Sequence, residues 1–291
     1  MAESLQALTV KAPAKVNLSL QIVEKRSDGY HELDGVMQKL DLFDTLHIKR
    51  LHDPGITLRC PDSGLPEDAS NLVYKAAAAY LQRAALKKEY GVSLVLEKQI
   101  PTAAGLGGGS SDAGAVLRTL NQLFDSALSQ DEMLVLAKEL GADVPFFVIS
   151  DTAVRARGIG EHMDSVLSLS RCSILLVNPG FSVSTAWAFK NFRLTRADKV
   201  SNLFDSRKNG ASNGAGYELF NDLEDVTINR YPEIAEIKER VLQAGAAGAL
   251  MSGSGPTVFG IFPDDCSGDV QQCANQLRNR YGKGVFVTRP L

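Results

Sequence analysis

Hydrophobic and polar side chains alternate strictly over residues 16–23, with the sequence VNLSLQIV. Successive side chains of a β-strand point to opposite faces, so this pattern predicts a strand with one apolar and one polar face. Lys15 shares its parity with Asn17, and we therefore expect both side chains to project from the polar face. The chain is then predicted to turn at Asp28 and Gly29.

Segments with helical spacing of apolar residues alternate with short apolar runs along the rest of the chain. Helices are predicted over residues 71–91, 113–124, 131–141, 232–245 and 267–280. Strands are predicted over residues 44–51, 92–100, 142–150, 152–163, 173–181, 249–262 and 284–290, where 249–262 holds two strands around a glycine turn. Because these elements fall into two groups, the sequence predicts an α+β fold with two domains, residues 1–167 and 168–291.

The segment PTAAGLGGGSSDAG, residues 101–114, places four glycines directly before a helical pattern. It lacks the lysine of a Walker A loop, and Ser110 stands where the dinucleotide fingerprint G-x-G-x-x-G needs its last glycine. Glycines nevertheless let a backbone approach an anion closely, and a helix start offers unpaired N–H groups and a positive dipole end. The segment indicates an anion site; a plain loop with a serine cap and Asp112 in the first turn is the alternative.

A second glycine-rich segment, SGSGPTVFG at residues 252–260, separates two apolar runs. A hairpin turn between two strands would account for its composition. Two segments rich in glycine and serine in one chain also suggest that both line the same site. The sequence leaves these two interpretations open.

Two charged residues have unusual surroundings. Asp143 lies in GADVPFFV, where Pro145 holds Val144 extended, and burial among apolar residues would raise the pKa of this carboxyl. A carboxylate of that kind suits a general base, although a helix cap or a buried ion-pair partner would look the same. Lys15, isolated in PAKVNL, has a solvated lysine as its alternative interpretation.

Composition excludes several classes of protein. The net charge of −3 and the absence of a long basic run argue against binding to nucleic acid or membranes. The four cysteines are scattered, without the spacing of a zinc site or a disulfide framework. The first residues lack the features of a secretion signal, so we expect a cytoplasmic enzyme. Residues 207–216, RKNGASNGAG, are predicted to form a mobile loop.

The segments KAPAKVNLSLQI, PTAAGLGGGSSDAG and GALMSGSGPTVFG together resemble the three motifs of the galactokinase–homoserine kinase–mevalonate kinase–phosphomevalonate kinase (GHMP) superfamily. Further similar segments are RSDGYHEL, LGADVPFF and ARGIGE. The resemblance implies a ribosomal S5 domain 2-like N-terminal domain and a ferredoxin-like C-terminal domain with the site between them. Gly114 departs from the family pattern, which usually has alanine there; from the sequence, this change only weakens the helix start.

The resemblance also implies an activity: transfer of a phosphoryl group from ATP, with Mg²⁺, to a hydroxyl of a small molecule. The family's catalytic pair falls on Lys15 and Asp143, with Asp143 as the base. The residues implied to bind the ATP phosphates are Pro101, Thr102, Ala103, Ala104, Gly105, Leu106, Gly107, Gly108, Gly109, Ser110 and Ser111. Asn71 and Lys75 match the residues at the adenine end. No metal ligand is assigned.

The substrate implied by the resemblance carries a cytidine diphosphate group. The residues implied to bind it are Asn17, Tyr30, His31, Thr185 and Phe189, with Tyr30 and Phe189 stacking on the base. The alternatives are a sibling kinase of the homoserine or mevalonate type, against which the segment DGYH argues, and a catalytically inactive nucleotide-binding module. The protein is expected to be a monomer or a weak homodimer.

Overall fold

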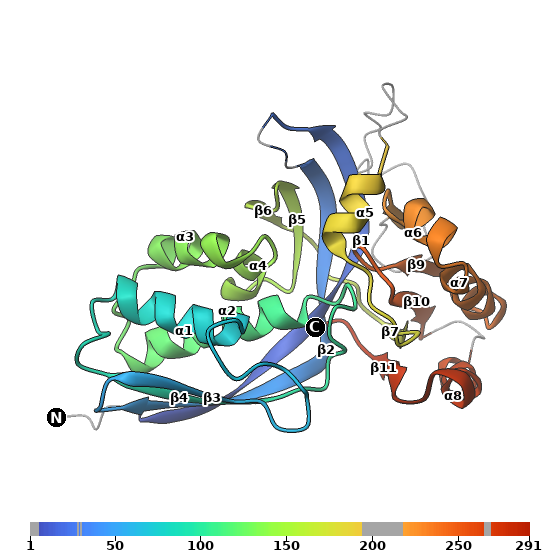
Figure 1. Ribbon diagram of the computed structural model, residues 1–291. Coiled ribbons are helices and arrows are strands. Elements are labelled where there is room, and N and C mark those ends of the chain that lie inside the picture. The colour runs from blue at the N-terminus through green and yellow to red at the C-terminus, as the bar shows by residue number, and fades with distance from the viewer. Residues whose placement is uncertain (1–5, 28, 30, 194–217, 265–268) are drawn as a thin grey trace. The chain divides into compact units, whose positions relative to one another are not determined.

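The computed structural model describes residues 6–27, 29, 31–193, 218–264 and 269–291. Helices and strands are combined throughout, so the predicted α+β class is confirmed (Figure 1). The predicted mobile loop at 207–216 lies outside the described residues. The chain forms two compact units: the first contains residues 1–14, 42–100 and 107–151, and the second contains residues 15–41, 101–106 and 152–291. The predicted domain division after residue 167 stays a prediction.

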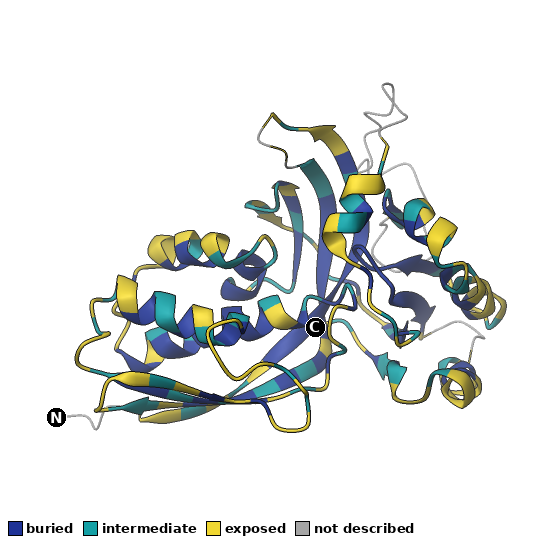
Figure 2. Cartoon of the chain, in the orientation of Figure 1, coloured by how far each residue is buried: buried dark blue, intermediate teal, exposed yellow. Residues whose placement is uncertain are grey.

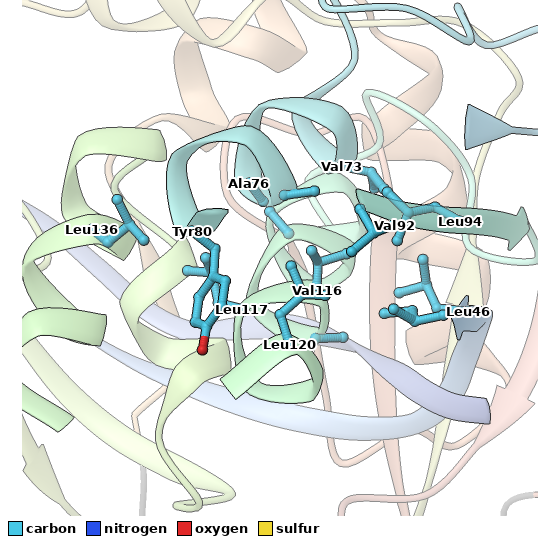
Figure 3. Close-up of a cluster of buried hydrophobic side chains, with 14 of the residues drawn as sticks. Leu46, Val73, Ala76, Tyr80, Val92, Leu94, Val116, Leu117, Leu120 and Leu136 are labelled. Carbon is cyan, nitrogen blue, oxygen red and sulfur yellow. The ribbon is translucent and has the colours of Figure 1, made fainter. Parts of the chain in front are cut away.

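The first unit contains part of a seven-stranded sheet, with helices packed against it. Strand β3 (Gly55–Arg59) runs parallel to β4 (Gly91–Glu97), which pairs antiparallel with the second half of β2 (His31–Leu51). The helices are α1 (Leu72–Arg83), α2 (Gly108–Leu123), α3 (Gln130–Leu140) and α4 (Val144–Val148). Figure 1 shows α1, α2 and α3 on one side of β3 and β4. Buried side chains from α1, α2, α3 and the strands form one core between these layers (Figure 3).

Two predicted elements of the first unit are wrong in part. The helix predicted over 71–91 ends at Arg83, because Ala85 takes a left-handed conformation with a φ of +58° and the chain turns before β4. The strand predicted over 142–150 is instead the short helix α4, with Pro145 in its first turn. All five residues of α4 are buried, and a short apolar run of this kind does not distinguish a strand from a buried helix.

The second unit contains other strands of the seven-stranded sheet and a separate four-stranded sheet. Residues 33–38 of β2 pair with β5 (Ala153–Gly158), which pairs with β6 (His162–Ser165). Strand β1 (Ala7–Lys25), whose residues from 15 onward belong to this unit, pairs with β8 (Phe220–Asn221). The separate antiparallel sheet has the order β11 (Val285–Thr288), β7 (Cys172–Val177), β10 (Val258–Pro263) and β9 (Gly248–Met251).

Four helices complete the second unit: α5 (Thr185–Asn191), α6 (Glu224–Arg230), α7 (Glu233–Gln243) and α8 (Val270–Tyr281). Apolar side chains of α7 and α8 pack with those of β7, β9 and β10 in one core. Their outer sides are exposed, as Figure 2 shows. The predicted strand, glycine turn and strand over 249–262 are confirmed as β9 and β10.

The expected polar face of β1 is not solvated. Lys15, Asn17 and Ser19 are as buried as the apolar residues that alternate with them, with exposed fractions of 4%, 7% and 2%. The half-buried strand predicted from the alternation is therefore wrong over this stretch. The polar face is directed into the protein, where its groups find hydrogen-bond partners.

Candidate functional site

The two glycine-rich segments contact each other within the second unit. The hydroxyl of Ser252 donates a hydrogen bond to the carbonyl of Gly105 over 2.9 Å, and the backbone N–H of Asn17 donates to the Ser252 hydroxyl over 3.2 Å. Gly105 has a φ of +76°, and a Cβ at this position would collide with the Ser252 carbonyl oxygen. The backbone N–H of Lys15 donates to the Leu106 carbonyl over 2.9 Å. The hairpin between β9 and β10 therefore supports the first glycine loop directly.

Lys15 and Asn17 are adjacent on the buried polar face of β1, as their shared parity predicts. The Lys15 ammonium donates a hydrogen bond of 2.5 Å to Asn17 Oδ1. A Cβ on Gly253 would lie 3.4 Å from Asn17 Oδ1 and 3.6 Å from Lys15 Nζ. The interpretation of Lys15 as a solvated lysine is therefore wrong, since this side chain is enclosed beside the second glycine turn.

Asn221, which the sequence analysis missed, fixes the shape of that turn. Its Nδ2 donates to the carbonyls of Met251 and Gly253, each over 2.7 Å, and its Oδ1 accepts from the Leu223 N–H over 2.9 Å. The residue is buried, so all three hydrogen bonds are shielded from water. A single asparagine in a polar stretch carries no pattern that would have identified it.

His31 and Phe189 lie against each other in the second unit, although they are far apart in the sequence. Their ring centroids are 5.3 Å apart and the planes are inclined by 26°, which is a stacked arrangement. Burial, and then the charge of Lys25, lowers the pKa of His31, so the imidazole is neutral at neutral pH. The hydroxyls of Thr185 and Ser254 are 2.9 Å apart. Tyr30, which is predicted to stack on the cytosine of the substrate, lies outside the described residues.

Helix α2 begins inside the glycine loop. Gly107 is the N-cap, with a φ of +68°, and the helix starts at Gly108. Ser110 and Ser111 therefore lie in the first turn, and the alternative of a serine N-cap is wrong. No side chain of the described residues caps this end, so the first N–H groups keep their capacity to bind an anion. The buried hydroxyl of Ser111 has no hydrogen-bond partner in the described part of the chain.

A buried group of three charges, missed by the sequence analysis, adjoins the start of α2. Lys98 Nζ bridges the carboxylates of Asp44 and Asp112, 2.8 Å from Asp112 Oδ2, and Asp44 also accepts from two backbone N–H groups. Burial raises the pKa of Asp112 to about 7, against the opposing effect of Lys98. Burial lowers the pKa of Lys98, but the two carboxylates outweigh it and leave that pKa raised.

Asp143 is the N-cap residue of α4 and is half-buried. Its side chain makes no capping hydrogen bond within the described helix, so the interpretation as a helix cap does not account for its carboxylate. Helix α4 lies against α2 at Gly114, where an added Cβ would be 2.7 Å from Phe147 Cβ. The expectation that Gly114 only weakens the helix is therefore wrong, because the position requires the close approach that glycine permits.

The two residues predicted at the adenine end differ in their surroundings. Asn71 is the N-cap of α1: its Oδ1 accepts from the Val73 N–H over 2.9 Å, and its Nδ2 donates to the Pro66 carbonyl over 2.8 Å. Lys75 is exposed on the same helix. Lys15 and Asp143 belong to different compact units, so their action as a pair stays a prediction.

Within the described residues, no three side chains of His, Cys, Asp or Glu are grouped in a way that could hold a metal ion. None of the described helices combines the length and the apolar character needed to cross a membrane. The described cysteines Cys60, Cys172 and Cys273 are free thiols.

Family models match both parts of the chain. The model described as "GHMP kinases N terminal domain" matches residues 71–151, and the one described as "GHMP kinases C terminal" matches residues 201–283. These matches agree with the fold implied by the three motifs.

Curated relatives are similar over most of the chain. A protein of Pelobacter propionicus named 4-diphosphocytidyl-2-C-methyl-D-erythritol kinase is 46% identical over 89% of this chain and 91% of its own. One of the same name from Desulfotalea psychrophila is 42% identical over 99% of this chain and 97% of its own.

Solved kinase structures are also similar to this chain over nearly its whole length. A crystal structure of 4-(cytidine 5'-diphospho)-2C-methyl-D-erythritol kinase superposes with a TM-score of 0.78 and 33% identity, covering 97% of this chain and 99% of that one. A homoserine kinase of Cytophaga hutchinsonii has a TM-score of 0.70 at 21% identity, covering 100% of this chain and 96% of that one. The second likeness shows a shared fold alone.

Proposed function

The chain belongs to the GHMP kinase family, and on that premise we propose that it transfers the γ-phosphoryl group of ATP to the 2-hydroxyl of 4-diphosphocytidyl-2-C-methyl-D-erythritol. This reaction belongs to the non-mevalonate route to isoprenoid precursors. The observation that carries the proposal is the similarity, over about nine tenths of the chain or more, to relatives that bear this enzyme's name.

In the proposed reaction, the first turn of α2 and the loop over residues 101–111 bind the ATP phosphates through backbone N–H groups. The uncapped start of α2 at Gly108 supports this assignment, since its N–H groups and dipole favour an anion. The support that Ser252 gives to Gly105 holds the loop in one shape before the nucleotide binds.

Asp143 is proposed to take the proton of the substrate hydroxyl as the oxygen bonds to the γ-phosphorus. The bond between that phosphorus and the oxygen bridging to the β-phosphate breaks, and ADP leaves. Lys15 is proposed to keep Asp143 ionised and to stabilise the charge that develops on the transferred group, with Asn17 orienting the substrate. The burial of Lys15 supports this role, because charge interactions are stronger away from water.

The cytosine of the substrate is proposed to bind at the stacked pair of His31 and Phe189, together with Tyr30 and Thr185. A half-buried pair of flat rings offers a surface on which a base stacks. The neutral imidazole of His31 has one nitrogen that donates and one that accepts, which suits the edge of a base. Asn71 and Lys75 are proposed to contact the adenine end of ATP.

Mg²⁺ is proposed to enter with the nucleotide. Mg²⁺ commonly keeps several water ligands and binds substrate phosphates, with only one or two protein oxygens. The hydroxyl of Ser111, which is buried in the first turn of α2 without a hydrogen-bond partner among the described residues, is the protein oxygen proposed to bind the ion. The ion would neutralise phosphate charge during the transfer.

The remaining proposals concern the whole molecule. We propose a division into domains at residues 167 and 168, a cytoplasmic location, and a monomer or weak homodimer that binds neither nucleic acid nor membranes. The net charge of −3 and the absence of a long basic run support the last two exclusions.

The test is ATP consumption with the diphosphocytidyl alcohol, homoserine and mevalonate as separate acceptors. We expect turnover of the first alone, and an Asp143→Ala variant that loses 100-fold or more in kcat, by about the factor that general bases contribute, yet still binds an ATP analogue. The matched control is Asp131→Ala, an exposed aspartate of α3, which should keep its kcat.

Turnover of homoserine or mevalonate alone would replace the substrate assignment with that of a sibling kinase. Binding of ATP without turnover of any acceptor would favour an inactive nucleotide-binding module. Full activity of Asp143→Ala would remove Asp143 as the base.

A further inference from the structure

Helix α2 makes two contacts with the short helix that follows Asp143. Gly114 and Arg118 are four residues apart and therefore lie on the same face of α2. At Gly114 the helix approaches Phe147 so closely that an added Cβ would lie 2.7 Å from Phe147 Cβ and 3.0 Å from its backbone carbon. Arg118 Nη1 donates a short hydrogen bond to the carbonyl oxygen of Phe147. Both contacts thus meet one residue of α4.

The partial burial of the Arg118 guanidinium is unfavourable by itself, and its hydrogen bond to the Phe147 carbonyl must compensate for it. The Arg118 side chain is half-buried, and this partial burial lowers its pKa. A buried cation is unfavourable unless a strong partner accepts its hydrogen bonds. The partner here is a carbonyl in the last turn of α4, one of the acceptors that a helix leaves unsatisfied and that attracts positive charge.

Helix α4 depends on such external contacts for its position. It has five residues, whereas isolated helices shorter than about 12 residues are marginal in water. Asp143 is its N-cap residue, so any movement of α4 against α2 displaces the Asp143 carboxylate.

We propose that Arg118, together with the close approach at Gly114, is a positioning residue that holds Asp143 in place for proton transfer, an inference that rests on the proposed function. The same helix begins at the proposed phosphate-binding turn. Gly108 and Gly114 are separated by about 9 Å along its axis, at 1.5 Å per residue. One rigid element thereby sets both the phosphate-binding turn and the support of the base.

The experiment compares Arg118→Met with Arg118→Lys and Gly114→Ala in the full chain. Arg118→Met keeps a long apolar stem and removes the donor, and we expect kcat to fall about 10- to 100-fold while the KM for ATP changes less than about threefold. Arg118→Lys keeps a cationic donor and should lose less. Gly114→Ala leaves Arg118 intact but displaces α4, and should lower kcat in the same selective way.

The matched control is Arg83→Met, because Arg83 forms an exposed ion pair with Glu139 over 3.3 Å in the same unit. It should leave kcat unchanged. Thermal unfolding and titration with an ATP analogue count the folded, nucleotide-competent molecules in each sample, so kcat is given per competent molecule.

An Arg118→Met variant with kcat within twofold of the parent, when Asp143→Ala is inactive, would overturn the positioning role. So would a loss that appears in the KM for ATP rather than in kcat. Full activity of Asp143→Ala would instead refute the proposed base, which separates that failure from a failure of the positioning role.

Discussion

The two glycine-rich segments have similar compositions but opposite environments. In the segment over residues 101–111, exposed positions such as Thr102 and Gly109 alternate with buried ones, and the segment ends in an uncapped helix start. The segment over residues 252–257 is buried throughout: Asn221 donates to its Gly253 carbonyl, and the Ser252 N–H donates to the Thr257 carbonyl. The first can offer N–H groups to a ligand, whereas the second directs its polar groups at the protein.

This difference shows that glycine has two functions in one chain. Gly109 has no atom within 4 Å of an added Cβ, so a side chain there would be directed into open space. Gly105 has a positive φ and faces the Ser252 carbonyl at a distance that excludes any Cβ. A high glycine content alone therefore does not distinguish a segment that is open to a ligand from one that packs against the rest of the protein.

The largest expected effect that tests this comparison comes from Gly105→Ala. The substitution introduces both a strained φ and a collision with backbone, so we expect a loss of about 3 kcal/mol or more in the free energy of unfolding, measured with urea. Gly109→Ala, within helix α2, should leave stability unchanged or raise it by up to about 1 kcal/mol. Equal losses in both variants would contradict the distinction.

The next effect tests the support of the buried segment. Asn221→Ala removes the donor that binds the Met251 and Gly253 carbonyls, and we expect a loss of about 2–3 kcal/mol because buried acceptors remain unsatisfied. Asn275→Ala, an exposed asparagine of α8, is the control and should stay within about 0.5 kcal/mol. An Asn221→Ala protein as stable as the parent would show that the turn needs no such partner.

The last prediction concerns the pH dependence of stability that arises from the buried charges of Asp44, Lys98 and Asp112, beside the start of α2. Burial raises the pKa of Asp112 from its ordinary value of 3.8 to about 7 in the folded protein, so the folded state holds this proton more firmly. Stability should therefore fall as the pH rises from about 4 to 7 and level off above 7. Asp112→Asn removes this titration. Urea unfolding at pH 5 and pH 7.5 checks it, and equal pH dependence in both proteins would refute the assignment.

Local pattern predicted much of the framework. The parity of Lys15 and Asn17 predicted their adjacency. The helical spacing beyond the glycines predicted α2, although α2 begins at Gly108, five residues before the predicted range of 113–124. Both depend on neighbours in the sequence, where strand and helix periodicity hold. The burial of Lys15 was not predictable in this way, because it depends on the hairpin around Gly253, which joins it from a distant part of the chain.

The buried charged group also depends on residues that are distant in the sequence. Asp44, Lys98 and Asp112 come from three segments, and the Asp44 partner lies 54 positions from Lys98. No periodicity connects such residues. The prediction of a strand at α4 was wrong for a different reason. Five consecutive buried apolar residues are compatible with either a strand or a buried helix, and the packing of Phe147 against Gly114 of α2 is a tertiary contact that this pattern does not contain.

The hydrogen bond between Asn17 and Ser252 joins residues 235 positions apart. Contacts of such sequence separation are slow to form, because the chain must lose much of its freedom before they are gained. The glycine loop over residues 101–106 is supported by this hairpin through the hydrogen bond from Ser252 to Gly105. We therefore expect the loop to take its shape only after these distant parts of the chain have come into contact. Recovery of nucleotide binding during refolding would therefore follow the completion of the fold. A peptide of the loop sequence alone would not form the site.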